Sequence, residues 1–150
     1  MVPFTSHMEQ ALAEARAAAA RGEVPVGAVV IAPDGRVAAA AGNRTRELSD
    51  PTAHAEILAL RAACAAAGSE RLPGYRLWVT LEPCPMCAAA ISAARIATLY
   101  YGAADPRMGG VAHGARVFDH PQCHHRPEVY EGIRANEAST LLRDFFAGRR

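Results

Sequence analysis

The spacing of apolar residues predicts an α-helix near the start of this chain. Met8 and Leu12 recur at helical spacing, and Ser6 followed three residues later by Glu9 forms a capping-box pattern. The pattern stops at Gly22, a residue type that commonly follows the end of a helix. We therefore expect the first helix to lie between Ser6 and Gly22.

The pattern then changes to that of a β-hairpin. Residues 24–31 form an apolar run that Pro25 and Gly27 interrupt early, and residues 37–41 form a second run. Between the two runs, Pro33-Asp34-Gly35 is a turn sequence. Two strands joined by a tight turn are expected here.

Helices and strands alternate through the rest of the chain. Asp50-Pro51-Thr52 offers a helix start, and Ile57, Leu60 and Cys64 then fall on one helical face until Gly68. The other expected elements are, in order, a strand at 77–81, a helix at 83–94, a strand at 96–101, a long loop at 102–127, and a final helix carrying Leu141, Leu142, Phe145 and Phe146. This order predicts an α/β fold, a three-layer α-β-α sandwich with a central mixed sheet.

Composition narrows the class of protein. Hydrophobic residues make up 51% of the 150 residues, which suits a single domain over residues 1–150 with a substantial core. The formal net charge of +1 gives no general attraction for nucleic acid, so any RNA-binding surface must be a local cluster. The alanine run at 17–20 is too short to cross a membrane, and the first four residues lack a signal-peptide pattern. We expect a cytoplasmic protein with no membrane segment.

The most informative chemistry is a set of three metal-binding side chains. His54 stands two residues before Glu56, and Cys84 and Cys87 follow about thirty residues later, with Pro83 directly before the first cysteine. One imidazole and two thiolates suit Zn²⁺, and three protein ligands leave a position for water, whose pKa zinc lowers towards neutrality. Glu56 is close enough in sequence to handle a proton of that water. The pattern therefore indicates a hydrolytic zinc site.

The expected helices support this interpretation. His54 and Glu56 fall in the first turn of one helix, and Cys84 and Cys87 in the first turn of another. Unpaired N–H groups at a helix N-terminus lower thiol pKa values and favour deprotonated ligands. Taken alone, Glu56 could also be an ordinary acidic residue at a helix start.

Two other uses of the cysteines stay open at this point. A structural zinc site would need a fourth ligand, and Cys123, His124 and His125 are available in the long loop. A redox Cys-x-x-Cys pair is a further alternative, although its usual sequence context is missing. The four cysteines do not form the pattern of a disulfide-stabilised domain, and the roles of Cys64 and Cys123 are not indicated.

Motifs along nearly the whole chain carry a resemblance to a known family. The H-x-E…P-C-x-x-C pattern is typical of zinc nucleobase deaminases. Further matching segments are Glu23-Val24-Pro25-Val26-Gly27-Ala28, Gly42-Asn43-Arg44, Asp50-Pro51-Thr52-Ala53, Val79-Thr80-Leu81-Glu82, Tyr101-Gly102-Ala103, Cys123-His124-His125 and Leu142-Arg143-Asp144-Phe145-Phe146. In these segments the chain resembles the bacterial tRNA-specific adenosine deaminases. The resemblance implies a cytidine deaminase-like fold, a homodimer, and conversion of adenosine to inosine at the wobble position of a tRNA anticodon stem-loop.

The resemblance also implies roles for individual residues. His54, Cys84 and Cys87 would bind Zn²⁺, and Glu56 would shuttle protons. The implied substrate-binding residues are Asn43, Val26, Gly27, Ala28, Ala55, Asp105, Phe145, Phe146, Arg149 and Arg150. Asn43 would hydrogen-bond the flipped purine, Gly27 would allow close approach, and the terminal residues would contact the stem-loop. From the residues alone, Asn43 and Asp105 could instead be ordinary turn formers.

Two other functions remain as alternatives. A zinc deaminase acting on a free base or nucleoside, of guanine or cytosine type, would share every catalytic residue. A non-catalytic, zinc-stabilised RNA-binding module would show a fourth protein ligand on the metal. The chain also departs from the family pattern at Arg107-Met108-Gly109-Gly110 and at Ala147-Gly148, where glycine weakens the last helical turn.

Overall fold

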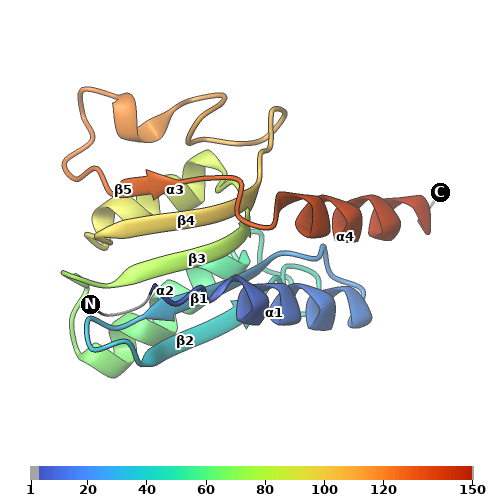
Figure 1. Cartoon of the computed structure of the whole chain (residues 1–150), viewed down its shortest axis with the longest axis horizontal. Coiled ribbons are helices and arrows are strands. Elements are labelled where there is room, and N and C mark those ends of the chain that lie inside the picture. The colour runs from blue at the N-terminus through green and yellow to red at the C-terminus, as the bar shows by residue number, and fades with distance from the viewer. Residues whose placement is uncertain (1–3, 150) are drawn as a thin grey trace.

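The computed structural model describes residues 4–149, which fold around one mixed five-stranded sheet with helices on both faces (Figure 1). The sheet order is β2-β1-β3-β4-β5, with β1 antiparallel to both of its neighbours and β3, β4 and β5 parallel to one another. The strands are β1 (Gly27–Ile31), β2 (Val37–Gly42), β3 (Arg76–Leu81), β4 (Thr98–Ala103) and β5 (Glu128–Tyr130).

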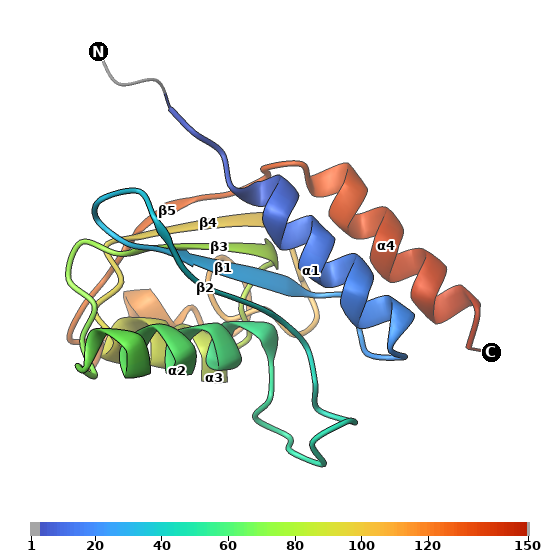
Figure 2. The same cartoon turned by 90° about the horizontal axis from the view of Figure 1, so that it is seen from below.

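Two helices cover each face of the sheet, so the predicted three-layer α-β-α sandwich is confirmed. In Figure 2, α1 and α4 lie together on one side of the strands and α2 and α3 lie on the other. The helices are α1 (Met8–Ala20), α2 (Ala55–Ala67), α3 (Pro85–Ala93) and α4 (Ala135–Ala147), with a short 3₁₀ turn at Val117–Asp119. No helix within residues 4–149 is long and apolar enough to span a membrane.

The two-residue period of the strands divides the core between the two helical layers. Along β1, Ala28 and Val30 pack with the α2 and α3 side, whereas Val29 and Ile31 pack with the α1 and α4 side. All five residues of β1 are buried, which a strand covered on both faces requires. Trp78 of β3 belongs to the second core and stacks on Tyr100 of β4, with ring centroids 3.9 Å apart.

Gly27 is a position where a side chain would not fit. A Cβ atom there would lie 1.9 Å from the carbonyl oxygen of Ala11 and 2.6 Å from the backbone nitrogen of Ala15. Helix α1 therefore packs directly on the first residue of β1. The close approach expected at Gly27 is an approach of helix to strand.

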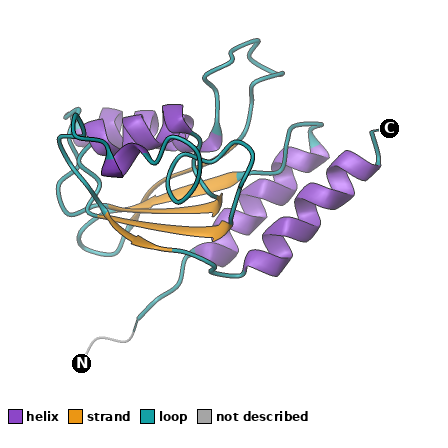
Figure 3. Cartoon of the chain, turned by 90° about the horizontal axis from the view of Figure 1, so that it is seen from above, coloured by secondary structure: helices purple, strands orange, loops and turns teal. Residues whose placement is uncertain are grey.

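Several predicted boundaries differ from the structure. β1 begins at Gly27 and not at residue 24, since Pro25 has no backbone N–H to donate to a neighbouring strand. α2 begins at Ala55 and not near Thr52, because residues 44–53 form a loop in which Asp50 accepts hydrogen bonds from the backbone N–H and hydroxyl of Thr52. Figure 3 shows this loop projecting from the body of the molecule.

The ends and faces of two helices were also mispredicted. The N-cap of α1 is His7, and Glu9 pairs with Arg16 rather than completing a capping box with Ser6. On α2 the fully buried side is formed by residues that include Glu56, Ala59 and Ala63. Ile57 and Cys64, expected on that face, are only partly buried.

Strand β5 lies where the sequence pattern gives no strand. It has only three residues, pairs with β4, and places Tyr130 over Tyr100 with ring centroids 5.4 Å apart. The partners of such a short strand are distant in sequence, so its local pattern carries almost no signal.

Candidate metal centre

The three proposed metal ligands meet at one edge of the sheet. Both β2 and β3 are antiparallel to β1, so they run in the same direction and their carboxyl ends lie at the same edge. α2 follows β2 and α3 follows β3, which places the N-termini of both helices at that edge. His54 is the N-cap residue of α2 and Cys84 is the N-cap residue of α3, with Cys87 one turn further on.

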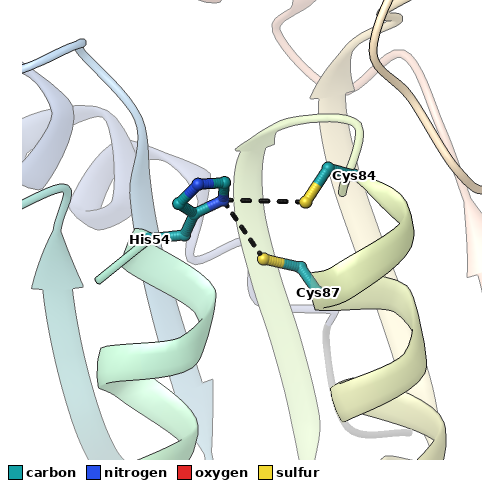
Figure 4. Close-up of side chains that lie close together, drawn as sticks. All are labelled: His54, Cys84 and Cys87. Atoms are coloured by element: carbon teal, nitrogen blue, oxygen red, sulfur yellow. Dashed lines mark hydrogen bonds between the residues drawn. The ribbon is translucent and has the colours of Figure 1, made fainter. Parts of the chain in front are cut away.

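The side chains of these residues point towards one another (Figure 4). The Nδ1 atom of His54 lies 3.6 Å from Sγ of Cys84 and 3.5 Å from Sγ of Cys87. The potential ligand atoms of all three residues lie within 4.8 Å of one another. A single ion can therefore contact one nitrogen and two sulfur atoms.

The protonation of the two thiols differs. Hydrogen bonding with Cys87 and with His54 outweighs burial and lowers the pKa of Cys84 to about 4. The pKa of Cys87 is raised, chiefly by its hydrogen bond with Cys84 and then by burial. The pKa of His54 is raised, first by its hydrogen bond with Cys84, although burial opposes this. Cys84 therefore provides a thiolate at neutral pH, as a soft metal ligand requires.

The donor set fits a catalytic zinc better than a structural one. Two sulfur atoms and one imidazole nitrogen are typical zinc ligands. Within residues 4–149, no fourth His, Cys, Asp or Glu joins the group. Cys123, one candidate for a fourth ligand, lies near the other end of α3, where its Sγ is 3.3 Å from Oγ of Ser92 and 3.1 Å from the carbonyl oxygen of His125.

Glu56 is a buried carboxyl group next to this centre. Its side chain lies in the first turn of α2, and the residue is only 4% exposed. Burial raises the pKa of Glu56 to about 7, while the backbone, His54 and a hydrogen bond with Cys87 act against that rise. A carboxyl group with a pKa near neutrality can both accept and release a proton, as acid–base catalysis needs.

Asn43 ties the end of β2 to the start of α2. Its Oδ1 atom accepts a hydrogen bond of 2.7 Å from the backbone N–H of Ala55, and its own backbone N–H donates to the carbonyl of Val26. The side chain is 8% exposed, and its Nδ2 atom has no hydrogen-bond partner among residues 4–149. The structure thus brings Asn43, Val26 and Ala55 together beside His54.

Ala28 contributes to the core and not to an exposed wall of the site. Both Ala28 and Ala55 are completely buried and belong to the same apolar cluster. They belong to the core between β1 and α2, the helix that begins directly after His54.

Asp105 lies in the loop after β4 and shapes that loop. Its Oδ1 atom accepts hydrogen bonds from the backbone N–H groups of Arg107 and Met108, at 3.2 and 3.0 Å. This is the turn-forming role that the sequence alone allowed. The carboxylate is partly exposed, and Arg107 beside it is exposed.

Glu82 is a residue of this region to which the sequence reasoning gave no role. It is fully buried and accepts hydrogen bonds from the loop after β4. Burial alone would raise the pKa of Glu82. Hydrogen bonds, the largest of them from the backbone of Asp105 and from His113, outweigh burial, so the pKa of Glu82 is lowered. In the sequence, the one sign of a role for Glu82 is its position: an acidic residue at the end of an apolar strand, directly before Pro83.

Two of the terminal residues expected to contact RNA, Phe145 and Phe146, lie on α4, on the other face of the sheet from α2 and α3, and Arg149 follows the end of that helix. Phe145 and Phe146 are in edge-to-face contact at 5.3 Å, and the guanidinium of Arg149 lies 4.0 Å from the centre of the Phe145 ring. Phe146 is 54% exposed. The end of α4 extends past the sheet edge at which β3 and β4 end, the edge of the metal centre (Figure 1). Arg150 lies outside the described residues.

Comparison with known proteins is consistent with this site. Residues 3–103 match the family described as the cytidine and deoxycytidylate deaminase zinc-binding region. The chain is 59% identical over 150 residues to a tRNA-specific adenosine deaminase of Agrobacterium fabrum (strain C58 / ATCC 33970), covering 100% of this chain and 98% of the relative.

Two solved structures are also similar. One, described as "Biochemical and Structural Studies of A-to-I Editing by tRNA:A34 Deaminases at the Wobble Position of Transfer RNA", has 61% identity and a TM-score of 0.88 over 90% of this chain and 97% of that one. The other is a guanine deaminase from Nitrosomonas europaea, with 25% identity and a TM-score of 0.83 over 98% of this chain and 87% of that one.

Proposed function

Because the chain belongs to the tRNA-specific adenosine deaminases, within the zinc-binding cytidine and deoxycytidylate deaminase family, we propose that it deaminates adenosine to inosine in tRNA. The proposed substrate is the adenosine at the wobble position of an anticodon stem-loop. The net reaction consumes water and releases ammonia from C6 of the base.

One observation carries the proposal. The group formed by His54, Cys84 and Cys87, with buried Glu56 beside it, lies in a chain that matches a tRNA-specific adenosine deaminase from end to end. A match confined to the zinc motif would fit any zinc deaminase. The 59% identity over the full chain, against 25% with the guanine deaminase, favours the tRNA substrate over a free base.

The metal and the carboxyl group have separate parts in the chemistry. His54, Cys84 and Cys87 would hold Zn²⁺, which when bound lowers the pKa of a coordinated water so that water can act as a nucleophile near pH 7. Glu56 accepts a proton from the water, delivers it to N1 of adenine, and assists the departure of ammonia. Its pKa of about 7 matches this two-way transfer.

The surrounding residues would hold the substrate. We assign to Nδ2 of Asn43 a hydrogen bond to the flipped purine, since its Oδ1 is already used by Ala55. Asp105 and Arg107 lie on one loop near the centre. Phe145 and Phe146 lie on α4, and Arg149 follows the end of that helix and packs on the Phe145 ring. A base in an anticodon loop is already largely unstacked, so moving it into the site costs little.

The assembly proposed for this function is a homodimer in the cytoplasm, where tRNA is found. Exposed Ala89 and Ala93 lie one turn apart on α3 and leave that helix open to close packing. They border a hollow of about 570 Å³ whose other wall includes Val117 and Cys123. Small residues beside an apolar hollow support a second copy of the chain as its occupant.

The deciding experiment compares substrates. The purified protein is incubated with a minihelix carrying adenosine at the wobble position, and separately with free adenosine, cytidine and guanine. We expect ammonia to be released only with the minihelix, where adenosine becomes inosine, since a free base or nucleoside lacks the phosphate and stacking contacts of the loop. Faster turnover of any free base or nucleoside would replace the proposal with the free-base alternative.

A further inference from the structure

Glu82 is a buried carboxylate whose hydrogen bonds all go to one loop. Its side chain is completely buried between β3 and α3. Oε1 accepts from the backbone N–H of Asp105 at 3.0 Å and is 2.8 Å from Nδ1 of His113. Oε2 accepts from the backbone N–H groups of Val111, Ala112 and His113, at 3.1, 2.9 and 3.1 Å. The carboxylate thus closes both ends of the segment from residue 105 to residue 113, named here the 105–113 loop.

The 105–113 loop is in direct contact with the segment that carries a metal ligand. The backbone N–H of Gly110 donates to the carbonyl of Pro83 at 2.8 Å. A Cβ atom on Gly110 would lie 2.6 Å from the nitrogen of Pro85 and 2.9 Å from the carbonyl carbon of Cys84. There is no space for a side chain between the loop and the start of α3. The position of the loop is therefore defined relative to Cys84.

The outer part of the same loop presents groups that can contact a substrate. Asp105 is partly exposed, Arg107 is exposed and Met108 is 68% exposed. The Asp105 carboxylate accepts hydrogen bonds from the backbone N–H groups of Arg107 and Met108. These bonds link the exposed residues of the loop to Asp105, the end of the loop that Glu82 holds.

We propose that Glu82 is a positioning residue for the deamination reaction: its carboxylate holds the 105–113 loop against the Cys84 end of α3 and so determines where Asp105 and Arg107 meet the RNA. This inference rests on the proposed function. Glu82 touches neither the substrate nor the metal, and acts through the loop.

A carboxylate, and not merely a polar residue of this size, is needed at this position. Both oxygens accept hydrogen bonds, two on Oε1 and three on Oε2. In Glu82→Gln, whichever way the amide is turned, its NH₂ group faces at least one backbone N–H donor: that of Asp105 on one side, or those of Val111, Ala112 and His113 on the other. Burying unpaired donors against one another loosens a loop without changing the volume of the core.

The test is hydrogen exchange combined with kinetics on the zinc-loaded protein. In Glu82→Gln, the amides of Val111, Ala112 and His113 are expected to exchange at least about tenfold faster, the scale of losing a charge-assisted hydrogen bond. KM for the minihelix should rise by about tenfold or more, with kcat changed less than about threefold, since the metal centre and Glu56 remain. Zinc content should stay at the wild-type level.

Two Glu→Gln controls separate this from a general effect. Glu23 is also buried and accepts backbone N–H groups of Arg46 and Glu47, at 3.1 and 2.8 Å, from the loop before α2. Glu23→Gln should speed exchange in that loop and leave Val111–His113 unchanged. Glu128→Gln, at an exposed position on the edge strand β5, should change neither loop.

The outcomes are distinct. If the amides of Val111–His113 exchange in Glu82→Gln at the wild-type rate, the proposal is refuted. A loss of zinc without faster exchange would also refute it, and would mean that Glu82 supports Cys84 instead. If Glu82→Gln does not fold, His113→Ala removes only the side-chain donor and should give the same changes at smaller size; no change there would refute the proposal. The exchange measurement needs no substrate, so failure of the tRNA assignment would appear separately in the wild-type assay.

Discussion

At the residue scale, neighbouring side chains are given different chemical states by their surroundings. His54 and Glu56 are two positions apart, yet the first faces two thiols and the second is enclosed by protein. Cys84 and Cys87 have pKa values shifted in opposite directions because each hydrogen-bonds with the other. These differences separate the three proposed metal ligands from the proposed proton carrier.

Replacing Glu56 should stop catalysis and leave the metal bound. In Glu56→Gln, we expect kcat to fall by about 10²–10⁴-fold or more, since proton transfer is lost while three metal ligands remain. Single-turnover inosine formation gives the rate, and atomic absorption gives the zinc content. Near-normal turnover would return Glu56 to the role of an acidic residue at a helix start.

Replacing either cysteine of the metal centre should remove both metal and activity. Cys84→Ala or Cys87→Ala leaves two ligands, too few to retain Zn²⁺ against dialysis with a mild chelator. Cys123→Ala is the matched control and should keep a full complement of zinc, because Cys123 contacts Ser92 and His125 instead. Zinc loss in Cys123→Ala as well would favour the structural-zinc interpretation, in which Cys123 is a fourth ligand.

At the scale of elements, the site depends on the start of α2. Asn43 from the end of β2 binds the first backbone N–H of that helix, while His54 occupies the N-cap position without a side-chain cap of its own. The same side chain therefore supports the helix with its oxygen and leaves its nitrogen available to a substrate. The two roles can be separated by substitution.

Two substitutions of Asn43 should give different results. Asn43→Ala removes the hydrogen bond to Ala55 and should lower the free energy of unfolding by about 1–2 kcal/mol, as loss of a helix-capping acceptor does. Asn43→Asp retains an oxygen acceptor and should keep more of that stability, but it loses the donor and should raise KM for the minihelix. Urea denaturation and steady-state kinetics measure the two effects. Equal KM values for wild type and Asn43→Asp would remove Asn43 from substrate binding.

At the scale of the whole molecule, the two exposed surfaces of interest lie on different parts of the fold. α4 extends past the sheet edge where the metal centre lies (Figure 1), and α3 lies on the opposite face of the sheet (Figure 2). The exposed side of α3 borders the hollow near Val117 and Cys123. An RNA at the first surface and a second copy of the chain at the other would occupy separate regions. The proposed dimer can therefore be tested independently of RNA binding.

A large charged residue on α3 should disrupt the proposed dimer. Wild-type protein is expected to sediment as a dimer at micromolar concentration, and Ala89→Arg as a monomer, because an arginine cannot be accommodated in a closely packed contact. Ala66→Arg, an exposed alanine of α2, is the matched control and should remain dimeric. A monomeric wild-type protein in sedimentation velocity would contradict the proposal.

The sequence by itself determined the chemistry of the site and, except for β5, the types of elements and their order. Hydrophobic period and turn residues are local properties, so α1, the β1–β2 hairpin, α3 and α4 could be predicted from neighbouring residues. His54, Cys84 and Cys87 could be proposed as ligands because zinc selects residue types and spacing, which the sequence displays directly. The exact start of α2 could not be predicted, since it depends on Asn43, which follows β2 and lies 12 residues before Ala55 in the chain.

Only the tertiary structure decided which distant residues meet. His54 reaches Cys84 and Cys87 because β2 and β3 are both antiparallel to β1, a pairing that no local pattern contains. β5 forms because it pairs with β4. Cys123 lies away from the metal centre because it packs against Ser92, near the C-terminal end of α3. The five hydrogen bonds of Glu82 to the 105–113 loop likewise arise from contacts more than twenty residues apart in sequence, and such contacts are set by the packing of the folded chain.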